Sequence, residues 1–137
     1  WLDGNGGGLI AAPTDQPTGA EWGCYGTSVW ANGTAIGTGA QNTVTIVQNG
    51  CASSSAASMC ANYDDGTYDD WFLPSKDELN EMYLNIGQGN ALGLGNIGGF
   101  VNNAYWSSTE SSSTKAWYEH FSNGYQNKTY KIGRAHV

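Results

Sequence analysis

Few residues of this chain have the types and spacing that catalysis requires. The two histidines, His120 and His136, belong to no H-E-x-x-H pattern, and no C-x-x-C pair occurs. A zinc site would normally show such spacing. No G-x-S-x-G elbow is present either, so a serine hydrolase has no sequence support. The sequence therefore does not predict an enzyme.

One acidic cluster could hold a metal ion. Four carboxylates, Asp64, Asp65, Asp69 and Asp70, lie within seven residues around Gly66. Oxygen ligands at this density suit a hard cation such as Ca²⁺, but the spacing differs from that of an EF-hand loop and the distant Glu is missing. Two interpretations remain: a weak calcium site and a solvated turn. We expect no other cofactor.

A stretch near the C-terminus combines aromatic rings with amides, hydroxyls and charges. Such surfaces suit sugar rings or protein hot spots, because they offer large contact area and adaptable hydrogen bonds. We expect the rings to stack on a ligand, the carboxylates and amides to hydrogen-bond to it, and two lysines to add positive charge. The candidate ligand residues are Glu110, Lys115, Trp117, Glu119, Tyr125, Gln126, Asn127, Lys128 and Tyr130.

The same stretch allows a plainer interpretation. Alternate residues of a strand point to one face, so Trp106, Trp117 and Phe121 could simply fill the core. Tyr125 to Lys128 lie in or after a turn, where exposure is expected. Trp117 thus stays open between a core residue and a stacking residue.

Charge and length narrow the choice of partners. The 137 residues suit one domain, residues 1–137, and the net charge is −7 with only five Lys and Arg. Nucleic-acid binding needs clustered cations, so we expect none. No apolar run of about 18 residues occurs, so we expect no membrane insertion. The low charged fraction, 12%, with many Ser, Thr, Asn and Gly residues, favours an extracellular or cell-surface protein.

Three cysteines give an odd count, so at least one thiol is free or paired between chains. We expect a disulfide between Cys51 and Cys60, because both flank a short Ser/Ala-rich segment. The alternative is a set of three buried thiols, as in a cytosolic protein. The role of Cys24 stays open.

The clearest predicted element is a helix over residues 76–86. Ser75 and Glu78 form a capping box, in which each side chain accepts from the other residue's amide. Leu79, Met82, Tyr83 and Ile86 follow at helical spacing, and Gly87 ends the helix.

The remaining elements are shorter. Residues 53–61 predict a helix capped by Ser53 or Ser54, residues 44–47 predict a strand, and residues 88–99 predict a loop. Three strands are expected over residues 105–109, 116–121 and 128–132, joined by tight turns into an antiparallel meander. The fold class is therefore α+β, with two short helices packed on antiparallel strands and much loop.

Several segments together resemble a known family. They are residues 22–27 (WGCYGT), 34–39 (TAIGTG), 70–79 (DWFLPSKDEL) and 105–110 (YWSSTE), in that order. The chain resembles the DUF1566 family, which contains the C-terminal domain of the Legionella collagen-like adhesin. The resemblance implies a C-type-lectin-like fold related to the formylglycine-generating enzymes, in a bacterial surface or secreted module that is sometimes trimeric.

Two departures limit what the resemblance implies. The late cysteine pair of the formylglycine-generating enzymes is absent, since no Cys follows Cys60. The adhesin is associated with sulfated glycans, whereas this chain is acidic. We expect a non-enzymatic recognition or adhesion module for a carbohydrate or a host or surface protein. The alternatives are a structural subunit or cap of a surface fibre, formed by copies of the chain, and a retroelement-diversified receptor-binding protein.

Overall fold

The computed structural model describes residues 7–16 and 19–137, and it confirms the α+β class. In this part of the chain the helices are α1 (Gly39–Gln48), α2 (Ala56–Ala61) and α3 (Lys76–Ile86). One antiparallel sheet contains β2 (Ala104–Glu110), β3 (Lys115–His120) and β4 (Tyr125–Tyr130), and a second pairs β1 (Ala20–Glu21) with β5 (Arg134–Ala135). The C-type-lectin-like fold stays a prediction.

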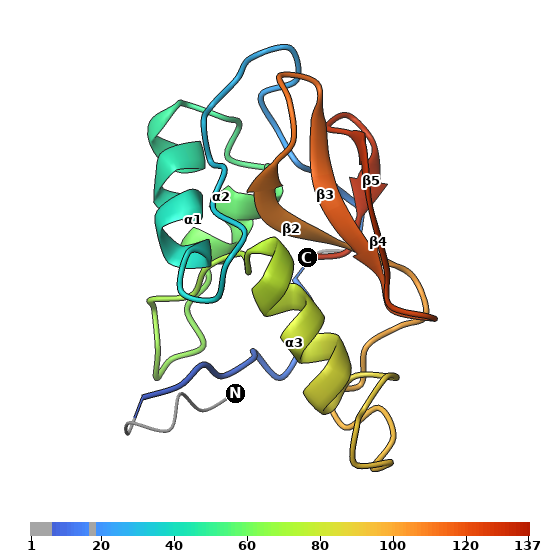
Figure 1. The fold of residues 1–137 in the computed structure, drawn as a ribbon. Coiled ribbons are helices and arrows are strands. Elements are labelled where there is room, and N and C mark those ends of the chain that lie inside the picture. Colours follow the sequence, from blue (N-terminus) through green and yellow to red (C-terminus); the bar gives the residue numbers. More distant parts are fainter. Residues whose placement is uncertain (1–6, 17–18) are drawn as a thin grey trace.

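The larger sheet is the predicted meander, with strand order β2-β3-β4. The first two strands lie within one residue of their predicted bounds, but β4 begins at Tyr125 rather than at residue 128. Gly124 is the last residue of the turn after β3 and adopts a φ of 75°. This backbone conformation lets β4 begin at the next residue. Figure 1 shows α1 and α2 beside the β2 edge of this sheet, with α3 running below it.

Helix α3 has the predicted bounds and the predicted cap. The Ser75 hydroxyl accepts from the Glu78 amide at 3.3 Å, and the Glu78 carboxylate accepts from the Ser75 amide at 2.7 Å. The second oxygen of Glu78 accepts from the Gly37 amide at 2.7 Å, two residues before α1 begins. One buried carboxylate therefore joins the N-terminal ends of two helices, where the helix dipoles favour negative charge.

The strand predicted over residues 44–47 is wrong, because this segment lies in α1. The inward face of α1 contains Gly39, Asn42, Thr43 and Ile46, which have helical spacing. Asn42 donates to the carbonyl of Gly33 at 2.7 Å, and the Thr43 hydroxyl accepts from the backbone amide of Leu73 at 3.0 Å. Tertiary packing through these polar groups outweighs the strand preference of the β-branched residues.

Helix α2 is capped by Ser55, not by Ser53 or Ser54 as predicted. The Ser55 hydroxyl accepts from the Ser58 amide at 3.3 Å. Trp22 and Trp106 lie in the larger core cluster, and Phe121 lies in a second cluster beneath α3. Trp106 and Phe121 are therefore core residues. No helix in the described part of the chain is long and apolar enough to span a bilayer.

Candidate functional site

Six of the nine candidate ligand residues lie on one face of strands β3 and β4. Residues directly opposite each other in an antiparallel pair point to the same side, and every second residue shares that side. Here the opposed pairs are Lys115 with Tyr130, Trp117 with Lys128, and Glu119 with Gln126. We call this set, together with Lys76, the β3–β4 face.

The β3–β4 face surrounds Trp117 with positive charge. The Nζ atoms of Lys76 and Lys128 lie 4.8 Å and 5.3 Å from the centroid of the Trp117 ring. The Nζ of Lys115 lies 4.9 Å from the ring of Tyr130. Three of the five Lys and Arg residues thus gather on one surface of a chain whose net charge is −7. These distances are within cation–π range.

Sequence reasoning missed Lys76, a member of this face, and Tyr25, which lies beside it. Lys76 is the first residue of α3, and the Gln126 amide donates to its carbonyl at 2.8 Å, which fixes α3 against β4. Tyr25 lies at the other end, with its ring 6.4 Å from that of Tyr130. The capping box located Lys76 on a helix, but no local signal showed which strand the helix contacts.

Tyr125 and Asn127 lie on the opposite side of β4. They are opposed to His120 and Tyr118 of β3, which alternate with the β3–β4 face. The Asn127 amide donates to the Tyr125 hydroxyl at 2.9 Å. The structure therefore does not bring these two candidates together with the other six.

Glu119 belongs to the β3–β4 face but lies in the interior. Its side chain is fully buried, and neither carboxylate oxygen has a hydrogen-bond partner among the described residues. Burial raises the pKa of the Glu119 carboxyl to about 8, and the positive charge of Lys76 offsets this only in part. Its expected role as a surface hydrogen-bonding group is not supported by its position.

Glu110 was also expected to meet a ligand, and its position contradicts this. Its carboxylate is buried and accepts from the Lys131 ammonium at 2.7 Å. The same carboxylate accepts from the amides of Val29 and Trp30 at 2.8 Å and 3.1 Å. Both carboxylate oxygens accept hydrogen bonds inside the molecule, so Glu110 holds the segment before α1 in place.

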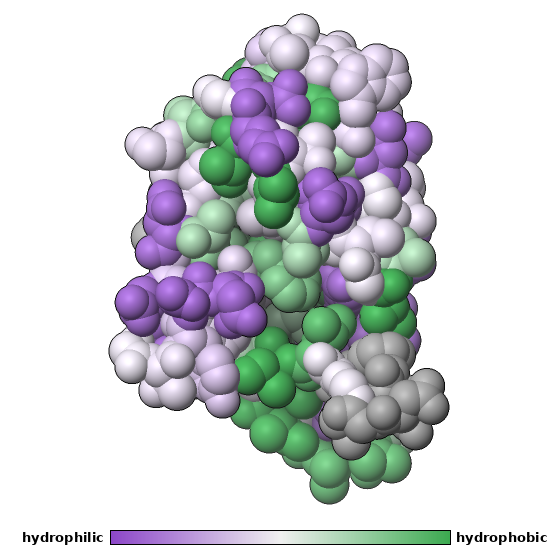
Figure 2. All heavy atoms as spheres, turned by 90° about the vertical axis from the view of Figure 1, so that its left-hand side faces the viewer, coloured by the Kyte–Doolittle hydropathy of each residue, from purple (hydrophilic) through white to green (hydrophobic). Residues whose placement is uncertain are grey.

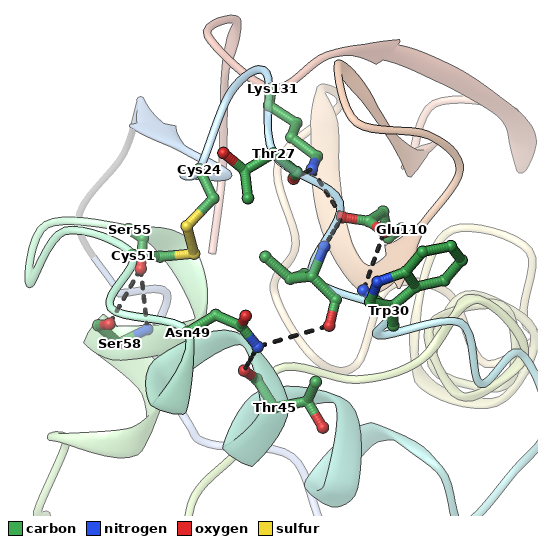
Figure 3. Close-up of a disulfide and its surroundings, with 11 residues drawn as sticks. Cys24, Thr27, Trp30, Thr45, Asn49, Cys51, Ser55, Ser58, Glu110 and Lys131 are labelled. Atoms are coloured by element: carbon green, nitrogen blue, oxygen red, sulfur yellow. Dashed lines mark hydrogen bonds and ion pairs between the residues drawn. A yellow bond between two sulfur atoms is a disulfide. The ribbon is translucent and has the colours of Figure 1, made fainter.

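The predicted disulfide between Cys51 and Cys60 is wrong, because the structure pairs Cys24 with Cys51 (Figure 3). Cys60 faces the core from α2 as a free thiol, and burial raises its pKa to about 12. Gly23 has a φ of 103°, and a Cβ there would lie 2.8 Å from the Ser55 Cβ. This close approach brings Cys24 to the start of the α2 segment. The disulfide joins chain regions 27 residues apart.

The acidic cluster is an exposed turn that uses its own carboxylates. Asp64 accepts from the Gly66 amide at 2.7 Å, and Asp65 accepts from the amides of Thr67 and Tyr68 at 2.8 Å and 2.7 Å. These amide contacts lower the pKa of Asp65. Asp69 and Asp70 follow, and no amide of a described residue donates to either of them. Among residues 7–16 and 19–137, no group of three or more His, Cys, Asp or Glu is placed to hold a metal ion.

The geometry defines a disulfide-bonded α+β domain with an aromatic and cationic sheet face. The Lcl C-terminal domain family matches residues 12–137 in sequence, so the chain belongs to that family, as the motifs implied. The family suggests the C-terminal domain of a surface protein, and the disulfide fits an oxidising environment. No curated protein matches the chain in sequence.

Proposed function

We propose that the chain is a non-enzymatic, extracellular recognition module that binds an acidic carbohydrate through the β3–β4 face. The observation that carries this proposal is the grouping of Lys76, Lys115 and Lys128 around the rings of Trp117 and Tyr130. An aromatic ring offers an apolar surface to a sugar, and an adjacent ammonium offers a partner to a carboxylate or sulfate group.

Because the chain as a whole is acidic, the β3–β4 face suits a short acidic ligand better than a long polyanion. Charges farther apart than about 8 Å are screened at physiological ionic strength. A short acidic glycan would therefore respond mainly to the three lysines that it touches, while the remaining carboxylates would repel a long polyanion. The preferred ligand would be a short glycan with one or a few acidic groups.

A glycan array containing neutral, carboxylated and sulfated sugars tests this proposal. Tyr130→Ala and Lys128→Ala, both at exposed positions, should each weaken binding about tenfold. Tyr125→Ala is a matched control, since Tyr125 and Tyr130 are 55% and 52% exposed on opposite sides of β4. Arg134→Ala controls for loss of one positive charge. Equal losses in variants and controls, or binding of neutral sugars alone, contradict the proposal.

A second candidate function is a structural subunit of a surface fibre. The loop between α3 and β2 exposes Leu92, Leu94 and Ile97, which are 81%, 62% and 59% exposed. Clustered apolar side chains of this kind favour association with another protein or another copy of the chain. Sedimentation velocity distinguishes the two functions: a concentration-dependent oligomer that Leu92→Ser with Leu94→Ser abolishes supports the fibre subunit, and a monomer at all concentrations excludes self-assembly.

A further inference from the structure

A cavity of about 330 Å³ lies away from the β3–β4 face. Its walls come from the N-terminal segment 8–16, from residues 68–74 and from α3. No residue of the β3–β4 face lines it. Figure 2 shows apolar residues gathered in the lower half of one side of the molecule, next to strongly hydrophilic ones. The volume is at the lower end of the range for small-molecule sites.

The charged residues lining the cavity all have the same sign. Its described lining includes Asp15, Asp70, Glu78 and Glu81 but no Lys, Arg or His. Since the net charge of the chain is also negative, the cavity carries a negative potential. A cation is therefore the favoured occupant, and an anion is disfavoured.

Three of the four carboxylates already have partners. Asp15 accepts from the Tyr105 hydroxyl at 2.6 Å, and Glu81 accepts from the Asn85 amide at 2.8 Å. Glu78 caps α3 as described above. Asp70 differs, because no hydrogen bond or ion pair between described residues engages its carboxylate. Asp70 is thus the carboxylate available to a ligand.

Three aromatic residues line the same cavity as Asp70, which is exposed. The centroid of the Trp71 ring lies 5.8 Å from that of Tyr63 and 6.2 Å from that of Tyr68, and the Tyr68 ring is perpendicular to it. All three residues line the cavity. The Trp71 indole N–H donates to the Tyr68 carbonyl, which fixes the orientation of the ring. The turn built by Asp64 and Asp65 holds Tyr68 in place.

From this arrangement we propose that the cavity binds a small organic cation with a quaternary ammonium group. Aromatic rings set at steep angles, with one carboxylate beside them, stabilise a methylated ammonium through cation–π contacts and charge. The described residues place no three His, Cys, Asp or Glu side chains together to hold a metal ion, so a metal is not the favoured occupant. A neutral apolar compound would gain nothing from Asp70. The apolar remainder of the lining, including Met82 and Phe100, suits the carbon atoms of the ligand.

The test is a nuclear magnetic resonance titration of the ¹⁵N-labelled chain with choline and with 3,3-dimethyl-1-butanol. The alcohol has nearly the same shape but no charge. We expect choline to shift the Trp71 indole signal and the amides of residues 68–71, and the alcohol to bind at least about tenfold more weakly. Equal affinity for the two compounds, or shifts confined to the β3–β4 face, would overturn the proposal.

Matched variants distinguish binding at Asp70 from a general effect of the negative charge of the chain. Asp70→Asn should weaken choline binding about fivefold or more, and Asp69→Asn, an equal charge change at a residue outside the cavity lining, should leave it within about twofold. Tyr68→Ala should weaken binding, with Tyr125→Ala as the control at similar exposure, 51% against 55%. Equal effects of Asp69→Asn and Asp70→Asn would show that only net charge acts, which contradicts the assigned site.

Discussion

Two buried carboxylic acids in neighbouring strands differ in their hydrogen-bond partners. Glu110, at the end of β2, accepts from the Lys131 ammonium and from two backbone amides. Glu119, within β3, has no hydrogen-bond partner among the described residues on either oxygen. Both side chains are nearly inaccessible to solvent. The two acids therefore differ in their hydrogen-bond partners and not in how deeply they are buried.

The comparison shows two ways in which a fold can bury an acid. At the β2 end, the Glu110 carboxylate lies against the Lys131 ammonium, which also donates to the Thr27 carbonyl at 3.0 Å. Within β3, partners are missing, and burial instead favours the protonated form of Glu119. The first region is a structural clamp, while in the second we expect stability to depend on pH.

The largest effect should come from breaking the Glu110 clamp. Lys131→Met leaves the Glu110 carboxylate buried without its counter-ion, which should cost about 3–5 kcal/mol of unfolding free energy. Urea denaturation measures the loss. The exposed pair of Arg134 and Glu21, 3.9 Å apart, provides the control: Arg134→Met should change stability by less than about 0.5 kcal/mol.

A second substitution should restore part of the stability that Lys131→Met removes. Adding Glu110→Gln to Lys131→Met removes the unpaired charge, so the double variant should be more stable than Lys131→Met alone. If Lys131→Met unfolds no more easily than Arg134→Met, then Glu110 and Lys131 do not form a stabilising pair.

Removing the disulfide should have the next largest effect. Replacing both Cys24 and Cys51 by Ser frees a loop of 27 residues, which should cost about 3.5 kcal/mol in the chain-entropy model. Calorimetry with and without reductant measures this, and the double variant should not respond to reductant. Mass spectrometry of the unreduced digest should show the Cys24 peptide joined to the Cys51 peptide. A Cys51–Cys60 peptide would contradict the structure.

Local patterns predicted much of the fold and failed where buried groups are polar. The capping box and the apolar spacing of Leu79, Met82 and Ile86 predicted α3 with its observed bounds. Helix α1 was missed because Asn42 and Thr43, both polar, occupy its inward face. Their partners, Gly33, Ser108 and Leu73, lie elsewhere in the chain. No periodicity of apolar residues could show this.

The candidate site was predictable only to the level of strand pairing. The sequence predicted that Lys115, Trp117 and Tyr130 belong to one stretch of strands and turns, and the observed register then places all three on the same side. The burial of Glu110 depends on Lys131, which is 21 residues away, and that of Glu119 depends on the position of α3. Such contacts follow from tertiary packing, so residue type and local spacing could not reveal them.

The unpartnered acid predicts a pH dependence. The pKa of Glu119 is raised from 4.5 to about 8 in the folded chain, so the folded state retains a proton that the unfolded state releases. This contribution to stability is complete below pH 4.5 and is lost as pH rises towards 8. Glu119→Gln has the shape of the protonated acid but cannot lose a proton. The variant should therefore lose less unfolding free energy as pH rises, and it should be more stable than the unchanged chain at pH 8 by at least about 1 kcal/mol.

Urea denaturation between pH 4.5 and 8.5 measures the unfolding free energy of the unchanged chain and of the Glu119→Gln variant. Glu81→Gln is a suitable control, because Glu81 lies on the outer part of α3 and its carboxylate already accepts from Asn85. Parallel curves for Glu119→Gln and the unchanged chain would show that Glu119 titrates normally, and would remove the contrast with Glu110.

The smallest effect concerns a third arrangement, in which exposed carboxylates are satisfied by amides. Asp64 and Asp65 already accept from backbone N–H groups of their own turn, so a calcium ion would have to compete with those bonds. Millimolar Ca²⁺ should therefore change the melting temperature by less than about 1 °C, since a ligand stabilises only through affinity for the folded state. Mg²⁺ at equal ionic strength is the control. A rise specific to Ca²⁺ that Asp69→Asn removes would instead identify a metal site in the turn, and would make the acidic cluster, like Glu110, a region that depends on a cation.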